Sequence, residues 1–422
     1  MRLADFEERL RKLRSLGVHK GAANLRPAPV KARRRAVEDL VAGRVVENNA
    51  GAFYLVEESF PLQHAHGART LADLLGYPPE LPARLARDAA IAALDYRRAA
   101  FVDIETIGLA GGTGTVAFMV GLGYYAEDCF RVEQYFMRDY HEEPAMLTTL
   151  AERMDGMDWL VSFNGRGFDM PILTTRFIMN RMPPRLSAAP HLDLLHPARR
   201  LWKTRLPSCR LGALEKDILG FWRDQADVPG YLAPQIYFDY LRTGDAREIA
   251  RVFYHNLYDV VSMAALAAQM CRIVAADDPA IHPEDILRAA SILEDAGETA
   301  QAEAAYRRAI ASPVSSEARE EALHRLALLC KRQGRRDDAR DLWSALSESR
   351  YGSDVSALVE LAKDCEHRQR DYAAALMHTE QALARVGAWP PGPDKRRALE
   401  ELEHRAERVR GKVQRADAGN NS

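Results

Sequence analysis

The periodicity of hydrophobic and polar positions changes along the chain and predicts several structural zones. Residues 1–42 are polar and arginine-rich, and Pro27 and Pro29 interrupt any long helix, so we expect a basic arm that is either a solvated tail or a phosphate-binding segment. Residues 44–62 carry β-branched and aromatic residues around an Asn-Asn-Ala-Gly turn, which predicts a β-hairpin. We therefore expect a hairpin with a connecting extension over residues 43–97.

Strand and helix patterns alternate over residues 98–275, which we expect to form one α/β domain. Three strand-like runs with short connections, AAFVDIET, VAFMVGLGYY and FRVEQYFM, predict an antiparallel meander. Helical patterns over 144–154 and 168–182 then alternate with the apolar runs WLVSF and HLDLL, which predicts parallel additions to the sheet. The expected fold is a mixed five-stranded sheet, three antiparallel plus two parallel strands, flanked by helices that include 211–219 and 246–274.

From Pro283 onward the strand patterns end and an alanine-rich helical repeat begins. Small and bulky residues recur at matching offsets in two successive units: Gly297, Ala302, Tyr306 and Ala309, then Gly334, Ala339, Trp343 and Leu346. A third unit, with Arg370, Ala375, Thr379 and Ala382 at the same offsets, departs at the glycine and aromatic positions, as is typical of a terminal capping unit. Small residues let two helices approach closely, and the bulky residue fills the space between neighbouring hairpins. The pattern resembles tetratricopeptide repeats, which implies an all-α solenoid over 283–410 that recruits a protein partner.

Composition is that of a globular protein with more than one domain, since 422 residues exceed the usual size of a single core. The net charge of -2 does not itself indicate nucleic acid, but basic runs occur at 31–35 and 199–210. The five cysteines form no CxxC pair, which argues against disulfides or a zinc site. The N-terminus lacks an apolar leader and no apolar run approaches the length of a membrane span, so we expect a cytoplasmic protein without a membrane partner.

Candidate chemistry begins with Asp103 and Glu105 at the end of the strand FVDIET. Alternation along a strand places both carboxylates on one face, where like charges beside apolar residues repel each other unless a cation is bound. An isolated D-x-E is more often a solvated strand end. Two later segments carry further candidate residues. The run NGRGFD places Asp169 directly after a predicted buried strand. His255 and Asp259 lie four residues apart on a predicted helix and so share one face of it. Taken separately, Asp169 could be a helix cap and the His255–Asp259 pair a surface hydrogen bond.

Together these residues resemble the DEDD-type 3'-5' exonucleases of the RNase H-like superfamily. The run from Asp103 to Thr115, DIETIGLAGGTGT, is similar to the strand-one signature of bacterial YprB-type RNase H-like proteins, and the resemblance covers residues 50–272. It implies that Asp103, Glu105, Asp169 and Asp259 bind two Mg²⁺ or Mn²⁺ ions and that His255 is the general base. Tyr254 is an alternative for that position, because the resembled motifs carry Tyr or His at slightly different spacing.

Further residues are candidates for substrate binding. The resemblance implies that Thr106 and Gly108 line the terminal nucleotide and that Asn164 holds the loop and the sugar, while Arg166 could meet a phosphate. Arg199, Arg200 and Lys203 surround Trp202, a pattern that either tracks and stacks a single strand or forms a solvated helix face. Asp193 is expected to cap a helix more readily than to support the site, and His64 and His66 to fill structural roles.

The sequence therefore predicts a metal-dependent nuclease, with a 3'-5' exonuclease on single-stranded DNA or RNA ends as the leading hypothesis. Two alternatives stay open: an inactive RNase H-like scaffold that binds nucleic acid and works through its repeats, and a structure-selective endonuclease. No GxxxxGK[ST] loop is present, so the sequence does not indicate an ATP-driven reaction.

Overall fold

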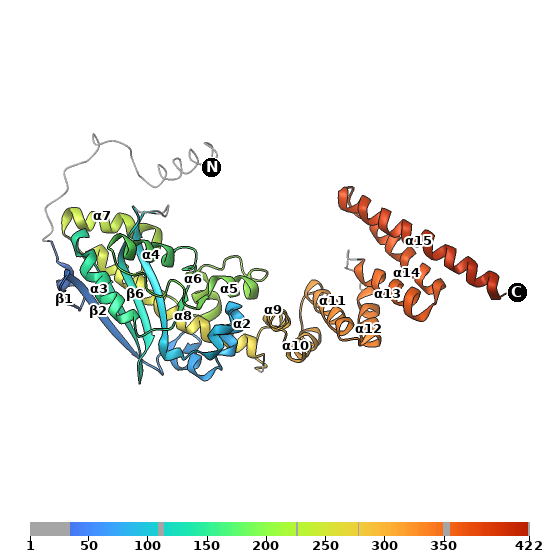
Figure 1. Cartoon of the computed structure of the whole chain (residues 1–422), viewed down its shortest axis with the longest axis horizontal. Helices are drawn as coiled ribbons and strands as arrows, with labels where there is room; N and C mark the ends of the chain where they lie inside the picture. The colour runs from blue at the N-terminus through green and yellow to red at the C-terminus, as the bar shows by residue number, and fades with distance from the viewer. Residues whose placement is uncertain (1–33, 109–113, 225–226, 277, 349–354, 421–422) are drawn as a thin grey trace.

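The computed structural model describes residues 34–108, 114–224, 227–276, 278–348 and 355–420. A sheet with helices packed around it forms one end of an elongated molecule, and helices α9 to α15 extend from it in a row (Figure 1). The C-terminal helices therefore lie far from most of the sheet. Most of the basic arm and the run 109–113 of the strand-one signature lie outside the described residues.

One mixed sheet of seven strands runs through the first part of the chain, in the order β1-β2-β7-β6-β5-β8-β9. The pairs from β1 to β5 are antiparallel, and β8 and β9 extend the sheet in parallel from β5. The strands are β1 (Arg44–Asn48), β2 (Gly51–Pro61), β5 (Ala99–Ile107), β6 (Val116–Tyr125), β7 (Cys129–Phe136), β8 (Trp159–Ser162) and β9 (His191–Asp193). A separate two-stranded pair consists of β3 (Ala65–His66) and β4 (Arg69–Thr70).

The expectation of five strands is wrong, and the reason lies in the hairpin. All five predicted strands are present in the predicted directions, but β2 pairs with β7 from Tyr54 opposite Phe136 to Pro61 opposite Cys129. This pairing satisfies the backbone groups of β7, which would otherwise form an open edge. The hairpin β1–β2 therefore belongs to the sheet, whereas β3 and β4 of the same segment do not. Local pattern predicted the hairpin correctly but did not show where it pairs.

Helices cover both faces of the sheet and enclose two apolar cores. Val102 and Ile104 of β5 lie in the core that includes α3, α4 and α7, whereas Phe101 lies in the core shared with the C-terminal half of α8. The helices of this part are α2 (Glu80–Ala86), α3 (Glu143–Met154), α4 (Asp169–Met179), α5 (Leu195–Trp202), α6 (Leu211–Leu214), α7 (Ala233–Thr243) and α8 (Arg247–Ala275). Short 3-10 helices are η2 (Val37–Asp39), η3 (Leu71–Gly76), η4 (Ala89–Ala93), η5 (Tyr96–Arg98), η6 (Tyr140–Glu142) and η8 (Gly230–Leu232), and η7 (Glu215–Leu219) is a short π-helix.

Helix α8 crosses the sheet and forms much of its apolar core. It has the length and hydropathy of a membrane span, which corrects the expectation that no apolar run approaches that length. However, 78% of its most apolar window is buried inside the fold. That burial is typical of a core helix in a globular domain.

The C-terminal part is helical throughout its described residues, and its helices pack in antiparallel pairs. They are α9 (Pro283–Asp295), α10 (Thr299–Ala311), α11 (Ser316–Arg332), α12 (Arg336–Ser347), α13 (Ser356–Asp364), η9 (Cys365–Gln369), α14 (Tyr372–Gly387) and α15 (Pro393–Asn420). Equivalent residues of the three repeat units share one geometry: Gly297, Gly334 and Arg370 all have a left-handed φ, of 81°, 79° and 57°. The small residues Ala302, Ala339 and Ala375 are all fully buried. The internal repeat inferred from spacing therefore corresponds to a repeated turn and packing position.

Candidate active site

Strand β5 carries the first two carboxylates of the predicted site. Asp103 and Glu105 lie on the same side of the strand, and a register shift between Glu105 and Thr106 marks the end of regular pairing with β6. Thr106 is buried, and its hydroxyl donates to the carbonyl of Gly108 at 3.3 Å. Thr106 therefore supports the turn after the strand, and the predicted contact of Thr106 and Gly108 with a nucleotide stays a prediction.

Asp169 enters the site from the first turn of α4, next to the middle of β5. Its Oδ1 accepts a hydrogen bond from the backbone N–H of Ile104 at 3.1 Å, so its carboxylate lies beside the strand that holds Asp103 and Glu105. Gly165 makes this approach possible. A Cβ added to Gly165 would lie 2.5 Å from Ser162 Oγ and 3.1 Å from Asp169 Oδ2.

Gly165→Ala should therefore disturb Asp169 directly. We expect a loss of about 1–3 kcal/mol in the free energy of unfolding, as for other overpacked sites, together with reduced activity. Gly167→Ala is the matched control, because a Cβ there meets only the Asn164 carbonyl, at 3.9 Å. Urea unfolding of both variants checks this, and equal stability of the two would show that Gly165 has no such role.

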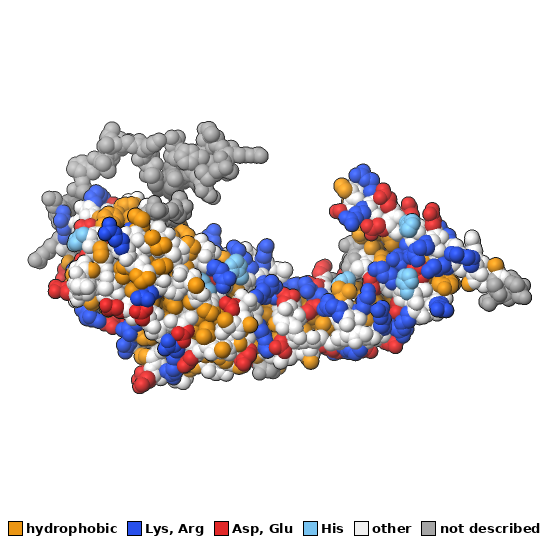
Figure 2. All heavy atoms as spheres, viewed as in Figure 1, with side chains coloured by type: hydrophobic (Ala, Val, Ile, Leu, Met, Phe, Trp, Pro, Cys, Tyr) orange, Lys and Arg blue, Asp and Glu red, His pale blue; other side chains and the backbone are white. Residues whose placement is uncertain are grey.

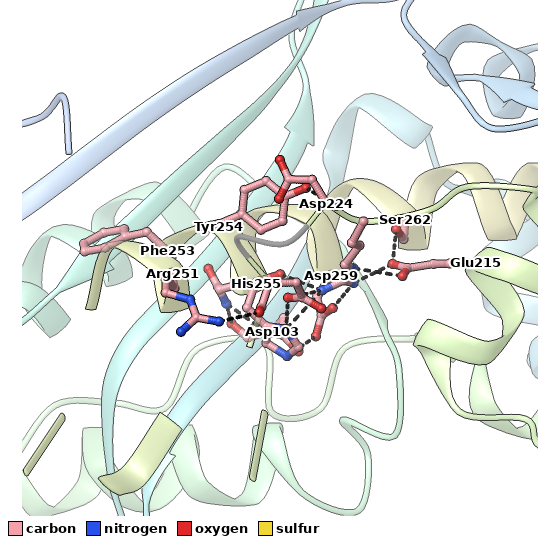
Figure 3. A network of polar contacts seen from close by, with 12 residues as sticks. Asp103, Glu215, Asp224, Arg251, Phe253, Tyr254, His255, Asp259 and Ser262 are labelled. Carbon is pink, nitrogen blue, oxygen red and sulfur yellow. Dashed lines mark hydrogen bonds and ion pairs between the residues drawn. The ribbon is translucent and has the colours of Figure 1, made fainter. Parts of the chain in front are cut away.

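His255 and Asp259 come from neighbouring turns of α8 and lie on its side nearest β5. Their side chains approach each other, with 3.5 Å between His255 Nε2 and Asp259 Oδ2. Figure 3 shows both directed toward Asp103, whereas Tyr254 lies beside Asp224 on the other side of the helix. The Tyr254 hydroxyl accepts a hydrogen bond from the Asp224 backbone N–H at 3.2 Å. The structure thus places His255, and not Tyr254, beside the carboxylates.

Asn256 fixes α8 against the strand that carries Asp103. Its side-chain amide donates to Asp103 Oδ2 at 2.8 Å and to the Asp103 carbonyl at 3.2 Å, while its Oδ1 accepts from Gln134 Nε2 at 2.9 Å. Asn256 is fully buried, and Gly121 leaves the space for it, since a Cβ on Gly121 would lie 2.4 Å from Asn256 Oδ1. The register of α8 on the sheet is therefore set by polar contacts at the site itself.

Arg223 connects Asp259 to two further carboxylates. Only 8% of its side chain is exposed, and it forms ion pairs with Asp259, Glu215 and Asp227. Ser262 donates to Glu215 (Figure 3). The Ser262 hydroxyl also lies 2.7 Å from His66 Nε2, so the network reaches the buried histidine of β3. The ion pair with Arg223 therefore fixes the Asp259 carboxylate.

The electrostatics of the strand carboxylates are unfavourable without a cation. The pKa values of Asp103 and Glu105 are both raised well above the usual range of a carboxyl group. Burial is the largest cause, and the negative charges of Asp259 and Asp169 follow it. Burial also raises the pKa of Asp169 to about 7, although hydrogen bonds from backbone N–H groups oppose this. Within the described residues no Lys, Arg or His forms an ion pair with any of these three carboxylates.

These carboxylates fit a hard divalent cation by their chemistry. Oxygen ligands are those that Mg²⁺ and Mn²⁺ prefer, and a cation would relieve the repulsion that raises their pKa values. In the part of the chain that the structure describes, no three His, Cys, Asp or Glu side chains are already close enough to enclose a metal ion. Binding would therefore require the side chains, and the Arg223 contact with Asp259, to rearrange.

The raised pKa values predict that the metal-free protein is less stable at higher pH. A carboxyl whose pKa is higher in the folded than in the unfolded state contributes its full stability below the unfolded pKa, near 4, and loses it as the pH rises through the folded pKa. For Asp169 this window extends to about pH 7. Urea unfolding in EDTA at several pH values should show this decline, and Asp169→Asn should flatten it. Parallel pH profiles of the variant and the wild type would contradict the assignment.

Asn164 and Arg166, which were candidates for substrate contacts, lie in a loop held by Asp193. The carboxylate of Asp193 accepts from the N–H groups of Asn164 at 2.7 Å, Arg166 at 3.1 Å and Leu195 at 3.1 Å. Asp193 therefore shapes the loop before Asp169 and contacts the first N–H of α5, but the N-cap of that helix is Leu194, which makes no side-chain cap, so the expected capping role is not the one that the structure shows. The Arg166 guanidinium donates to the His191 carbonyl at 2.6 Å, so this arginine is engaged with β9 in the structure.

Two arginines of the basic run 199–210 pair with the C-terminal helices. Arg200 pairs with Asp295 at 2.7 Å and Arg205 with Asp285 at 2.9 Å, both on α9. Trp202 is fully buried, and its Nε1 donates to Asp285 at 3.4 Å, so the prediction that it stacks on a nucleic-acid strand is wrong. Arg199 and Lys203 are exposed, and their substrate contact stays a prediction.

Sequence reasoning missed several residues that shape this site. Asn256 lies directly after His255, and the available sequence signal was a single amide on an otherwise apolar helix stripe with Phe253 and Val260. Arg223, Asp227 and Glu215 carried no such signal, because their loop and turn have no regular periodicity. Asp227 Oδ1 lies 2.7 Å from His255 Nδ1, a contact between positions far apart in the sequence.

Comparison with known proteins agrees with the RNase H-like resemblance. A model of the RNase H superfamily matches residues 100–271. The chain is 33% identical over 338 residues to YprB of Bacillus subtilis (strain 168), which covers 78% of this chain and 79% of that protein. Among solved structures, the family B DNA polymerase from the hyperthermophilic archaeon Pyrobaculum calidifontis is similar at 16% identity and a TM-score of 0.35, over 56% of this chain and 29% of the polymerase.

Proposed function

Because the chain belongs to the family of YprB from Bacillus subtilis (strain 168) and carries an RNase H superfamily domain, we propose that it is a metal-dependent nuclease. The observation that carries the proposal is that Asp103, Glu105 and Asp169 lie together, Glu105 and Asp169 buried and Asp103 half-buried, with no ion pair to a basic side chain among the described residues. Such an arrangement is costly for the fold and is typical of a functional site. The reaction is hydrolysis of nucleic-acid phosphodiesters.

Four side chains would hold the divalent cations: Asp103, Glu105, Asp169 and Asp259. Two Mg²⁺ or Mn²⁺ ions bound there supply charge stabilisation for the attacking and leaving oxygens of the scissile phosphate. Asn256 positions Asp103 through its hydrogen bond to Oδ2. Arg223 balances the charge of Asp259 in the absence of a cation, while it also pairs with Glu215 and Asp227.

His255 is the general base of the proposed reaction. Asp227 Oδ1 lies 2.7 Å from Nδ1, and Arg223 Nη1 lies 3.1 Å from the same atom, so the shorter contact favours a proton on Nδ1 shared with Asp227. This tautomer leaves Nε2, on the Asp259 side, free to accept a proton from water. Burial lowers the pKa of His255, but the charge of Asp259 and the hydrogen bond to Asp227 outweigh burial and leave the pKa raised.

We propose that the enzyme is a DEDD-type 3'-5' exonuclease acting on single-stranded ends. A 5'-labelled single strand, as DNA and as RNA, incubated with the full chain and Mn²⁺ tests the mode of cleavage. Progressive shortening supports an exonuclease, and one internal product supports the structure-selective endonuclease instead. Absence of cleavage of both strands would overturn the proposed enzyme.

A second candidate function is a nucleic-acid-binding scaffold without turnover. The ion pair between Arg223 and Asp259 favours it, because a guanidinium there competes with a cation for that carboxylate. In either case we propose that residues 283–410 form tetratricopeptide-like repeats that bind a protein partner. Figure 2 shows basic and acidic side chains interspersed over these helices, a surface suited to a partner of mixed charge. Binding of a single strand without Mn²⁺-dependent cleavage would favour the scaffold.

A further inference from the structure

Exposed aromatic side chains gather beside the proposed active site. Of the nine exposed large hydrophobic side chains that the structure describes, four fall between residues 222 and 238. Trp222 is 67% exposed and Tyr231 is 70% exposed, and they are the most exposed of the nine. The other tryptophans are buried or partly buried. A large aromatic side chain left in water over so much of its surface commonly marks a binding surface.

Both aromatic residues are next to residues that contact His255. Trp222 precedes Arg223, whose guanidinium reaches His255 and Asp259. Tyr231 follows Gly230, and a Cβ added to Gly230 would lie 3.1 Å from His255 Nε2. The backbone that carries each exposed ring is therefore fixed relative to the candidate base.

Trp222 also lines a cavity that is continuous with the site. The cavity has a volume of about 330 Å³, and its wall includes Trp222, Lys216 and Phe221 together with His255 and Asp259. Small-ligand sites span roughly 300–1,000 Å³, so this cavity is at the lower end of that range. The Lys216 ammonium lies 4.3 Å from the centre of the Trp222 ring, which brings a positive charge to an aromatic surface.

From these observations we propose that this cavity is a subsite for one unpaired nucleotide of a single-stranded polynucleotide, with the base stacked on Trp222 and the adjoining phosphate neutralised by Lys216. The proposal rests on the proposed function and adds the feature that selects the substrate. Every base has a face that can stack on an aromatic ring, so the subsite tolerates any sequence. A base within a duplex is already stacked and paired, so it cannot enter without unpairing.

Binding measured without turnover tests the subsite separately from catalysis. Fluorescence anisotropy of a 5'-fluorescein single strand is recorded with the full chain, with Ca²⁺ in place of Mn²⁺. Stacking on an aromatic residue is worth about 1–3 kcal/mol per base, so Trp222→Ala should weaken binding by about 5- to 150-fold. Trp222→Phe keeps a ring and should recover much of the affinity. Lys216→Ala should lower the salt dependence of binding.

Phe238→Ala is the matched control, since Phe238 is 48% exposed but does not line the cavity. A blunt duplex of the same sequence should bind weakly and lose little affinity in Trp222→Ala. Equal single-strand affinity of Trp222→Ala and wild type, or an equal loss for the duplex, would overturn the subsite.

No binding of either nucleic acid by wild type would also overturn it and would assign the aromatic surface to a protein partner. If wild type binds through Trp222 but never cleaves with Mn²⁺, the nuclease function fails and the subsite stands.

Discussion

Replacing Asp103 by Asn together with Glu105 by Gln should lower Mn²⁺-dependent cleavage by on the order of 10³-fold or more. Metal-ion stabilisation of transition-state charge is worth several kcal/mol, and each 1.4 kcal/mol corresponds to a factor of ten in rate. Both replacements keep the shape of the side chains, and an Asn at position 103 can still accept the hydrogen bond from Asn256. Single-turnover cleavage of a labelled oligonucleotide measures the effect.

The same double variant should not lose stability. Because burial and neighbouring carboxylates raise the pKa of Asp103 and Glu105, neutral side chains there remove repulsion from the metal-free fold. We expect a thermal unfolding midpoint in EDTA at least equal to that of wild type, and a rise on adding Mn²⁺ only in wild type. Glu127→Gln with Asp128→Asn, in the exposed turn between β6 and β7, is the matched control and should keep both cleavage and the Mn²⁺ response. A fully active Asp103–Glu105 variant would contradict the assignment of these carboxylates.

His255→Gln should reduce kcat by about 10²- to 10⁴-fold, the usual contribution of a general base, while Tyr254→Phe should stay within about twofold of wild type. The two residues are adjacent, yet His255 lies 3.5 Å from Asp259 and Tyr254 lies against Asp224. Steady-state rates over a pH series measure both variants. The acidic limb of the wild-type profile, where His255 becomes protonated, should be absent from the residual activity of His255→Gln.

The opposite ranking would assign the base to Tyr254. If Tyr254→Phe lost activity and His255→Gln kept it, α8 would have to present its other side to the substrate. A loss in His255→Gln that leaves the acidic limb unchanged would make His255 a positioning residue for Asp259 instead. Circular dichroism of both variants confirms that α8 is intact.

Much of the fold could be predicted because it depends on local pattern. The strands β5 to β9, the hairpin β1–β2 and the long helix α8 all carry period-two or helical patterns that are visible in the sequence. The pairing of β2 with β7 could not be predicted, because either edge of the sheet accepts a hairpin and only tertiary packing selects one. The repeated left-handed turns at Gly297, Gly334 and Arg370 followed the predicted spacing even where glycine is absent.

The candidate site could likewise be predicted from the sequence only in part. Asp103 and Glu105 share one face of a strand, Asp169 begins a helix after a buried strand, and His255 and Asp259 share one face of a helix, so the pattern allowed their meeting to be anticipated. The role of Arg200 and Trp202 could not, because their partners Asp295 and Asp285 lie on a helix of the other part of the chain. Arg223 and Asp227 come from a loop whose path has no sequence signature, and they surround His255 only in the folded protein.

The most direct test of the account is a titration of Mn²⁺ into the metal-free full chain, followed by electron paramagnetic resonance of the free ion. The account predicts that wild type removes free Mn²⁺ from solution at concentrations at which Asp103→Asn with Glu105→Gln leaves the signal unchanged. Loss of free ion should be equal in wild type and in the Glu127–Asp128 control variant. A wild-type signal identical to that of buffer at every concentration would contradict a divalent-cation site formed by these carboxylates.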